Sequence, residues 1–183
     1  MAALEQAMRV FWAKGYEGAQ LADLIAAMGI NPPSFYAAFQ SKAAIYREAI
    51  ALYLSTSGAG SMTALHEPPL TRDAIRAMLL ASVEVALASP TAGGCMVSLG
   101  MVNASSSNAS LRDDLRALRR ETTRLIRERL DRGVLDGDLP TDLDTGRLAL
   151  FYSTIVQGLS LQAQDGASRD ELVGIVDMAM RAL

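Results

Sequence analysis

The chain has 183 residues, of which 50% are hydrophobic and 20% are charged, and its formal net charge at pH 7 is −3. This composition can bury a sizeable core, in one domain or in a small domain joined to a larger one, and it excludes a disordered chain. A single cysteine and a single histidine exclude internal disulfides and multi-cysteine zinc sites, and they make a His-rich metal site or a Ser-His-Asp triad hard to build.

The first part of the chain is electrically neutral. Its basic residues are Arg9, Lys14, Lys42 and Arg47, and its acidic residues are Glu5, Glu17, Asp23 and Glu48. These charges cancel, so residues 56–183 hold the whole net charge of −3. Any phosphate contact made by residues 1–55 must therefore depend on the placement of individual side chains.

No apolar run reaches the roughly 18 residues of a membrane span. The chain starts directly in an amphipathic pattern, without a positively charged signal region. We therefore expect a cytoplasmic protein with no membrane partner.

Helical periodicity begins at the N-terminus. Its first apolar stripe is Leu4, Ala7, Met8, Phe11 and Trp12. This i, i+3, i+4, i+7, i+8 spacing predicts a helix that ends at Lys14-Gly15. The same spacing between Leu21 and Met28 predicts a second helix, which Gly29 stops.

The stretch NPPSFYAAFQSK, residues 31–42, places two prolines between helical patterns. Asn31 is a good N-cap, and Pro32 suits the first helical position, where a missing N–H has no cost. Pro33 is still in the first turn, where proline is tolerated. The prolines therefore predict the start of a third helix, with Phe35 and Phe39 on its core face.

The next helix is expected to start at Ser41 as N-cap and to run to about Leu54. Residues 55–70 are small, polar and proline-rich, which predicts a hinge between a domain over 1–54 and a larger one over 55–183.

The larger domain also has a helical pattern. We expect a helix from a Thr71 cap to about Ser89, a break over 90–94, a short helix in GCMVSLG and a long one over 107–132, followed by a turn-rich GVLDGDLP. Thr141 with Asp144 and Ser168 with Glu171 resemble capping boxes for the last two helices. With no alternating strand pattern, the predicted fold class is all-α.

The second and third helices have the spacing of a helix-turn-helix, whose third element enters the DNA major groove. Facing away from Phe35 and Phe39 are small residues and one tyrosine, whose hydroxyls and methyl groups suit phosphates and base edges. Lys42 lies in the first turn of a helix, where the dipole disfavours cations unless an anion is bound. Each of these features alone has an ordinary structural explanation, but together they favour a DNA-reading surface.

These residues resemble a known family. FWAKGYEGAQLADLIAAMGINPPSFYAAFQSKAAIYREAI is similar to the DNA-binding module of TetR-family (tetracycline-repressor-like) transcriptional regulators. The matching residues are Phe11, Gly15-Tyr16, Leu24-Ile25-Ala26, Gly29-Ile30, Ser34-Phe35-Tyr36, Phe39 and Ser41-Lys42. The chain departs from the family pattern at Ala19-Gln20, where a Thr/Ser pair is frequent, and it begins at MAALEQ without a basic arm.

The resemblance implies which residues contact an operator in double-stranded DNA. Backbone contacts are implied for Gln20 and Leu21 and a phosphate contact for Lys42. Groove contacts are implied for Asn31, Pro32, Pro33, Ser34, Tyr36 and Ala37. One such module reads too few base pairs for useful specificity, so we expect a homodimer on a palindromic site.

The segment LALFYSTIVQGLSLQA is apolar nearly all round, so one of its faces needs a partner beyond the subunit. With the last helix it could form a four-helix bundle across a two-fold axis. The predicted dimer residues are Leu148, Phe151, Tyr152, Ile155, Leu159, Leu172, Ile175 and Val176.

The resembled family holds a small-molecule effector among its central helices. The candidates here are Met62, Leu65, Met78, Val83, Cys95, Met96, Leu99, Met101 and Val102, with Tyr152 and Gln157 as polar groups. Methionine makes a deformable apolar lining, so we expect a small, mostly apolar effector that releases a repressor from DNA.

Other interpretations remain open. The chain could be an all-helical binding or interaction protein without DNA binding, or a redox or metal sensor through Cys95. The single His, the single Cys and the lack of a phosphate loop argue against an enzyme, and we expect no metal and no cofactor. The eight arginines over 112–132 alternate with acidic residues, with Arg124–Glu128 and Glu128–Arg132 at i, i+4, which predicts a solvated face.

Overall fold

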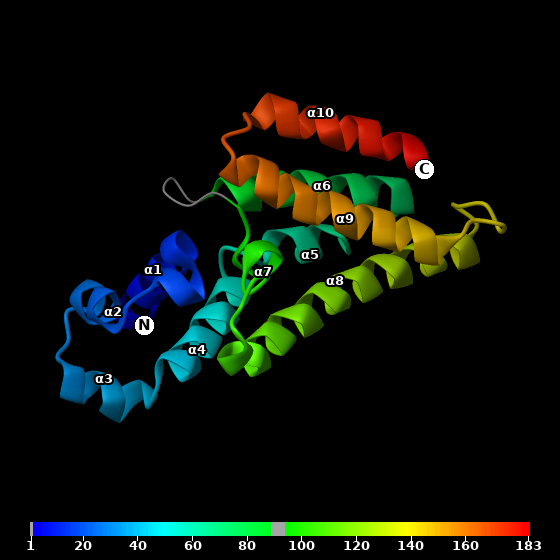
Figure 1. The fold of residues 1–183 in the computed structure, drawn as a ribbon. Helices are drawn as coiled ribbons and strands as arrows, with labels where there is room; N and C mark the ends of the chain where they lie inside the picture. Colours follow the sequence, from blue (N-terminus) through cyan, green and yellow to red (C-terminus); the bar gives the residue numbers. More distant parts are fainter. Residues whose placement is uncertain (1, 89–93) are drawn as a thin grey trace.

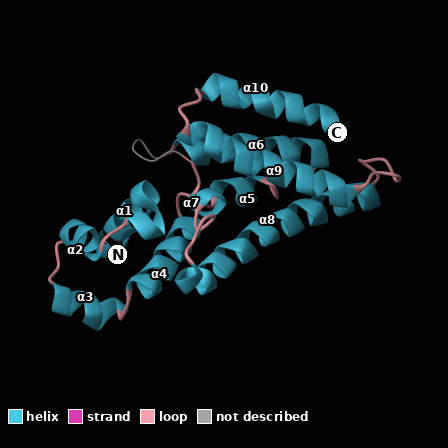
Figure 2. Ribbon diagram, in the orientation of Figure 1, coloured by secondary structure: helices cyan, strands magenta, loops and turns pink. Residues whose placement is uncertain are grey.

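The computed structural model describes residues 2–88 and 94–183, and all regular secondary structure in this part of the chain is helical (Figure 2). The helices are α1 Ala2–Gly18, α2 Leu21–Met28, α3 Pro32–Phe39, α4 Lys42–Ser55, α5 Gly60–Ala64, α6 Thr71–Leu87, α7 Met96–Leu99, α8 Ala109–Asp136, α9 Thr145–Gln164 and α10 Arg169–Ala179, with short 3₁₀ turns at Ser106–Asn108 and Met180–Ala182. No helix among the described residues is long and apolar enough to cross a membrane.

Helices α1, α2 and α3 form a cluster at one end of the molecule, and α4 leads from it towards the remaining helices (Figure 1). Phe11, Leu24, Phe35 and Ile45, one from each of these helices, are fully or almost fully buried at its centre. Aromatic rings strengthen this core, since Phe11 and Tyr46 meet edge to face with centroids 5.0 Å apart.

The apolar core of this cluster continues into the rest of the chain. Met96 and Val97 of α7 and Leu111 and Leu115 of α8 belong to the same buried cluster as Phe11 and Phe35. The predicted reading module, which consists of α1–α4, therefore rests on α7 and the start of α8. The predicted domain limit at residue 54 stays a prediction.

A second core lies among α6, α8, α9 and α10, with α6, α9 and α10 stacked beside one another (Figure 1). Met78, Ile126, Tyr152 and Val176 are completely buried there. The Tyr152 hydroxyl donates to the carbonyl oxygen of Ala179 at 3.3 Å, which ties α9 to the end of α10.

Several helix limits differ from the expectations. Residues after Gly15 continue as helix to Gly18, although Gly15 itself has φ 66° and kinks α1. The expected hinge over 55–70 contains the short helix α5, which packs on α6. Helix α9 has Asp144 rather than Thr141 as its N-cap, because the Asp144 carboxylate accepts from the Arg147 N–H at 3.0 Å. The expected break over 90–94 lies, except for Gly94, outside the described residues.

Of the caps predicted at Ser168 and Thr71, one is confirmed and the other is wrong. The Ser168–Glu171 capping box is confirmed, with the Ser168 N–H donating to the Glu171 carboxylate at 2.8 Å. Thr71, however, is the first residue of α6 and not its cap. The Asp138 carboxylate acts instead, accepting from the Thr71 N–H at 2.6 Å and from its hydroxyl at 3.1 Å.

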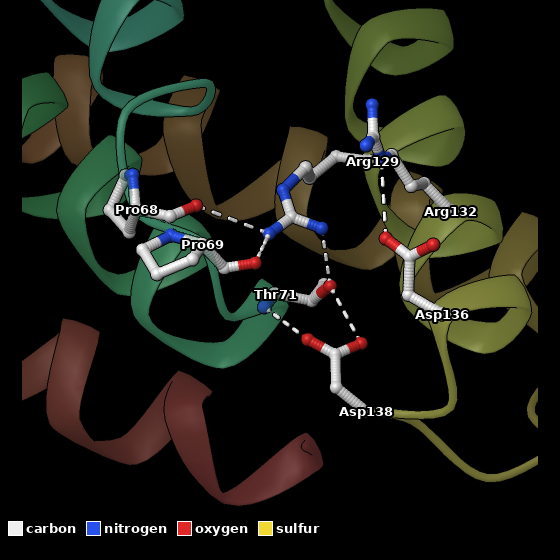
Figure 3. Close-up of polar contacts among 7 residues, drawn as sticks. All are labelled: Pro68, Pro69, Thr71, Arg129, Arg132, Asp136 and Asp138. Atoms are coloured by element: carbon white, nitrogen blue, oxygen red, sulfur yellow. Dashed lines mark hydrogen bonds and ion pairs between the residues drawn. The ribbon is translucent and has the colours of Figure 1, made fainter.

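A buried arginine explains why Thr71 is used differently. Arg129 of α8 is only 8% exposed, and its guanidinium donates to the Thr71 hydroxyl and to the carbonyl oxygens of Pro68 and Pro69 (Figure 3). The cluster holds the turn before α6 against α8. The buried Thr71 hydroxyl would lose a charged donor without the arginine, which would be costly.

Gly133 belongs to the same cluster. A Cβ at this position would lie 2.2 Å from the Thr71 hydroxyl oxygen and 2.6 Å from the Asp138 carboxylate. Gly133 therefore permits a close approach and does not form a turn. Helix α8 continues through the GVLD segment to Asp136, and Gly137 caps it with φ 80°.

The expectation of a solvated arginine face holds for the five exposed arginines, which are Arg116, Arg120, Arg124, Arg127 and Arg132. It is wrong for Arg129, which is buried, and Arg112 and Arg119 are half-buried. Arg132 pairs with Asp136 at 3.2 Å and not with Glu128.

We predict that Arg129→Met lowers the free energy of unfolding by about 2–3 kcal/mol, because the buried Thr71 hydroxyl and the carbonyl oxygens of Pro68 and Pro69 lose their guanidinium donor. The matched variant is Arg132→Met, one turn along α8, whose side chain is 74% exposed and should change stability by less than about 0.5 kcal/mol. Urea denaturation of both variants measures the difference. Equal stabilities would show that the cluster does not fasten α6 to α8.

Candidate functional site

The turn between α2 and α3 has the geometry that the sequence predicts. Gly29 is left-handed, with φ 65°, and its N–H returns to the carbonyl oxygens at the end of α2. The Asn31 side chain then caps α3 by accepting from the Ser34 N–H at 2.9 Å. Pro32 and Pro33 occupy the first two helical positions, so the pair of prolines begins the helix.

Helix α3 presents a continuous exposed surface. Phe35 is fully buried and meets the ring of Phe39, with centroids 5.7 Å apart. The residues implied to contact DNA in this helix and its cap are all exposed: Asn31, Pro32, Pro33, Ser34, Tyr36 and Ala37. Tyr36 is 53% exposed, and its ring packs edge to face on Phe35, so the tyrosine is held in place without losing access to solvent.

The start of α2 has a different cap from the Thr/Ser pair that is frequent in the family. Gln20 is the N-cap, and its N–H donates to the Asp23 carboxylate at 3.0 Å. Asp23 is also paired with Lys14 at 2.9 Å, and these contacts lower the pKa of its carboxyl. Gln20 is exposed and Leu21 is half-buried beside it, so both can lie against a DNA backbone.

Lys42 contacts an aromatic ring of the same chain. Its ammonium lies 4.4 Å from the ring centroid of Tyr16, a cation–π contact. Partial burial lowers the pKa of the lysine, while the nearby Glu17 opposes the shift. The contact holds the lysine side chain at the N-terminal end of α4, which follows α3 in the chain.

The junction between α3 and α4 is strained. Gln40 has φ 63° and ψ −43°, and the Ser41 N–H donates across it to the Phe39 carbonyl oxygen at 2.6 Å. This is a tight three-residue turn of the kind that L residues adopt at a cost. It sets the angle between the exposed helix α3 and α4.

Behind the reading module lies a cavity of about 390 Å³, between the end of α4, α5, α7, α8 and α9. Of the predicted effector residues, Met62, Cys95 and Gln157 line it. Other apolar walls come from Leu118, Leu125 and Val156. A cavity of this size and polarity is typical of a small-molecule site.

The other predicted effector residues lie elsewhere. Leu65, Met78, Val83 and Tyr152 are completely buried in the core of α6, α9 and α10. Met96 and Met101 belong to the core beneath the reading module, and Leu99 faces a smaller hollow beside α1. Val102 is 59% exposed. Helical periodicity identified apolar positions but could not separate core from cavity wall.

Tyr53 is one of several cavity residues that sequence reasoning missed. It lies one turn beyond Ala49 on the core face of α4 and is fully buried. The signal that could have found it is a tyrosine among aliphatic core positions, since a buried tyrosine hydroxyl needs a partner. No group of three or more His, Cys, Asp and Glu side chains in the described ranges could hold a metal ion.

The predicted dimer residues divide into two sets. Leu148, Tyr152, Leu159, Leu172 and Val176 are buried inside the subunit, because α6 packs against their faces of α9 and α10. This part of the prediction is corrected. Phe151, Ile155 and Ile175 instead line an open apolar depression on the outer side of α9 and α10.

The outer face of α9 and α10 extends beyond the predicted residues. Leu150, Leu161 and Met178 are 63%, 47% and 60% exposed. Gly158 and Gly174 lie within these helices, and a Cβ at either would meet nothing within 4 Å. Glycine inside an exposed helix is unfavourable by itself, so these positions suit the close approach of another helix.

Two protein-family profiles match this chain. The family profile "Bacterial regulatory proteins, tetR family" matches residues 3–49, and "Tetracyclin repressor-like, C-terminal domain" matches residues 69–177. The chain belongs to the TetR family. It is therefore a DNA-binding transcriptional regulator and not an enzyme, and the matched N-terminal segment contains the α2–α3 turn and Lys42.

Individual TetR-family proteins are similar to this chain over nearly its whole length. The repressor ComR of Escherichia coli (strain K12) is 29% identical over 98% of this chain and 86% of its own, and the repressor BdcR of the same organism is 26% identical over 99% and 87%. A cysteine mutant of the regulator CifR, in a structure with 26 bp operator DNA, is 44% identical, with a TM-score of 0.94 over 98% of this chain and 94% of its own.

We predict that Gln40→Gly raises the free energy of unfolding by about 1 kcal/mol, because glycine adopts the positive φ of this junction without strain. Ala38→Gly is the matched control, since it makes an exposed helical glycine in α3 and should cost about 1 kcal/mol. Thermal denaturation of both variants shows whether each substitution raises or lowers the free energy of unfolding. A loss of stability in Gln40→Gly would mean that the junction is not strained.

Proposed function

We propose that this TetR-family regulator is a homodimeric repressor, which binds a palindromic operator through α3 and leaves it when a small, mostly apolar effector enters the cavity. The observation that carries the proposal is the exposed surface of α3, held by its Asn31 cap and by the buried Phe35. It acts in the cytoplasm, where it meets chromosomal DNA.

The proposed DNA contacts follow from this surface. Ser34, Tyr36 and Ala37 enter the major groove, with Pro32 and Pro33 at the leading end of the helix. Asn31 contributes chiefly as the cap, because its side-chain oxygen accepts from the Ser34 N–H. Gln20 and Leu21 approach the backbone from α2, and Lys42 meets a phosphate. The structure of the CifR mutant, which is 44% identical to this chain, contains operator DNA, and this supports DNA binding by the present protein.

The proposed dimer forms through the outer face of α9 and α10. Phe151, Ile155, Ile175 and Met178 supply an apolar patch, and Gly158 and Gly174 let the partner helices come close. Packed on its copy across a two-fold axis, this pair of helices makes a four-helix bundle. The two reading helices then lie at a separation that the bundle fixes.

Effector action follows from the position of α4. Tyr53 and Leu54 near its end line the cavity, while its start follows directly from α3 through the Gln40 turn. A molecule that favours another position of Tyr53 therefore favours another position of α3. The two reading helices of the dimer then no longer match successive major grooves, and operator affinity falls.

We predict that Lys42→Gln weakens operator binding and reduces the slope of log K against log salt concentration by about 2, because each subunit loses one phosphate contact. Arg181→Gln, an exposed position in the last 3₁₀ turn, removes the same charge far from α3 and should leave the slope unchanged. Fluorescence anisotropy on DNA from the upstream region of the gene measures both. Absence of sequence-specific binding by the unmodified protein at low salt would contradict the proposed function.

We also predict that Met178→Asp converts the dimer to monomer, raising its dissociation constant at least about 100-fold, because a carboxylate would be buried without a partner. Val102→Asp is the matched control, since the two side chains are 60% and 59% exposed and Val102 lies outside α9 and α10. Sedimentation analysis distinguishes the two. A dimeric Met178→Asp protein would place the interface elsewhere.

A further inference from the structure

The two charged side chains at the cavity already have partners. Arg119 donates to the carbonyl oxygens of Val97 at 2.8 Å and Gly100 at 3.0 Å. Glu121 accepts from the Arg124 guanidinium at 2.7 Å on the outer side of α8. An uncharged molecule leaves these contacts as they are, whereas a charged molecule would have to give up its hydration in a largely apolar cavity, so the cavity favours an uncharged molecule.

The Tyr53 hydroxyl, in contrast, is not satisfied. It is buried beside the Cys95 thiol and the Met96 backbone, but it makes no hydrogen bond of normal geometry with any described residue. Burial raises the pKa of this tyrosine far above its ordinary value, and the nearby Cys95 adds to the shift. The hydroxyl therefore keeps its proton and offers one donor.

We propose that the molecule bound in this cavity is uncharged and mostly apolar, with an oxygen acceptor such as a ketone, ester or ether that accepts a hydrogen bond from Tyr53. This rests on the proposed function only in treating the molecule as the effector. An acceptor oxygen removes the cost of the buried donor, whereas a hydrocarbon of the same shape does not. Tyr53 thereby selects oxygen-containing ligands over hydrocarbons.

Tyr53 also transmits occupancy to the reading module. Its ring meets the Trp12 ring edge to face, with centroids 5.1 Å apart, and the Trp12 indole N–H donates to the Gly94 carbonyl oxygen at 2.9 Å. On its other side the ring is closely confined, because a Cβ at Gly58 would lie 2.5 Å from it. Because the hydroxyl is buried, a ligand oxygen reaches it only if the Tyr53 ring moves, and the contact with Trp12 passes this movement to α1.

The test uses probes matched in shape. Acetophenone carries a carbonyl oxygen where α-methylstyrene carries a methylene group, and benzoate adds a charge. Trp12 is the single tryptophan of the chain, so its indole N–H gives one NMR signal that reports on this site. Titration of the full-length protein should shift this signal with acetophenone more strongly than with α-methylstyrene, and benzoate should not shift it.

Tyr53→Phe removes only the hydroxyl. It should weaken acetophenone binding about fivefold and leave α-methylstyrene binding unchanged, as expected for the loss of one neutral hydrogen bond. Its melting temperature should be no lower than that of the unmodified protein, because an unsatisfied donor is lost. Tyr46→Phe makes the same change in α4 at a buried tyrosine outside the cavity, and it should leave both affinities unchanged.

Three results would overturn the inference. One is a lack of acetophenone binding at millimolar concentration. Another is an equal effect of Tyr53→Phe on the two uncharged probes. The third is a marked loss of stability in Tyr53→Phe, which would show that the hydroxyl is already bonded. Operator binding without a probe tests the proposed function separately, since the NMR titration needs no DNA.

Discussion

The buried face of α4 holds the reading helices to the rest of the protein. Ile45, Tyr46, Ala49, Ile50 and Tyr53 lie along this face and are at most 5% exposed. At one end the face packs on α1, and at the other it meets α7 and the cavity. Since a packed interior transmits strain, the buried face of α4 is the path by which the proposed effector action would pass from the cavity to α3.

Polar contacts accompany this packing without replacing it. Arg47 reaches Asp114 at 2.8 Å, and Glu17 accepts from the Ser105 N–H at 3.2 Å, so that both α4 and α1 are tied to the approach to α8. These pairs are exposed, and such contacts contribute little to stability. They fix an orientation, whereas the apolar core supplies the attachment on which the proposed link between cavity and DNA depends.

Residues with local roles could be predicted from the sequence. The Asn31 cap, the proline start of α3 and the Ser168–Glu171 capping box each involve neighbours within one helical turn, and the structure confirms them. Thr71 was assigned wrongly by the same reasoning. Its true partners, Arg129 and Asp138, lie far along the chain, and no local pattern indicates them.

The sequence by itself determined the all-helical class, the helix-turn-helix spacing and the residues that face away from Phe35, because these depend on periodicity and caps. Only the tertiary structure decided which apolar residues form core, cavity wall or outer face. Tyr152 and Phe151 are adjacent in α9, yet one is buried against α10 and the other is exposed. A helix that is apolar all round has no periodicity to distinguish its faces, so its neighbours assign them.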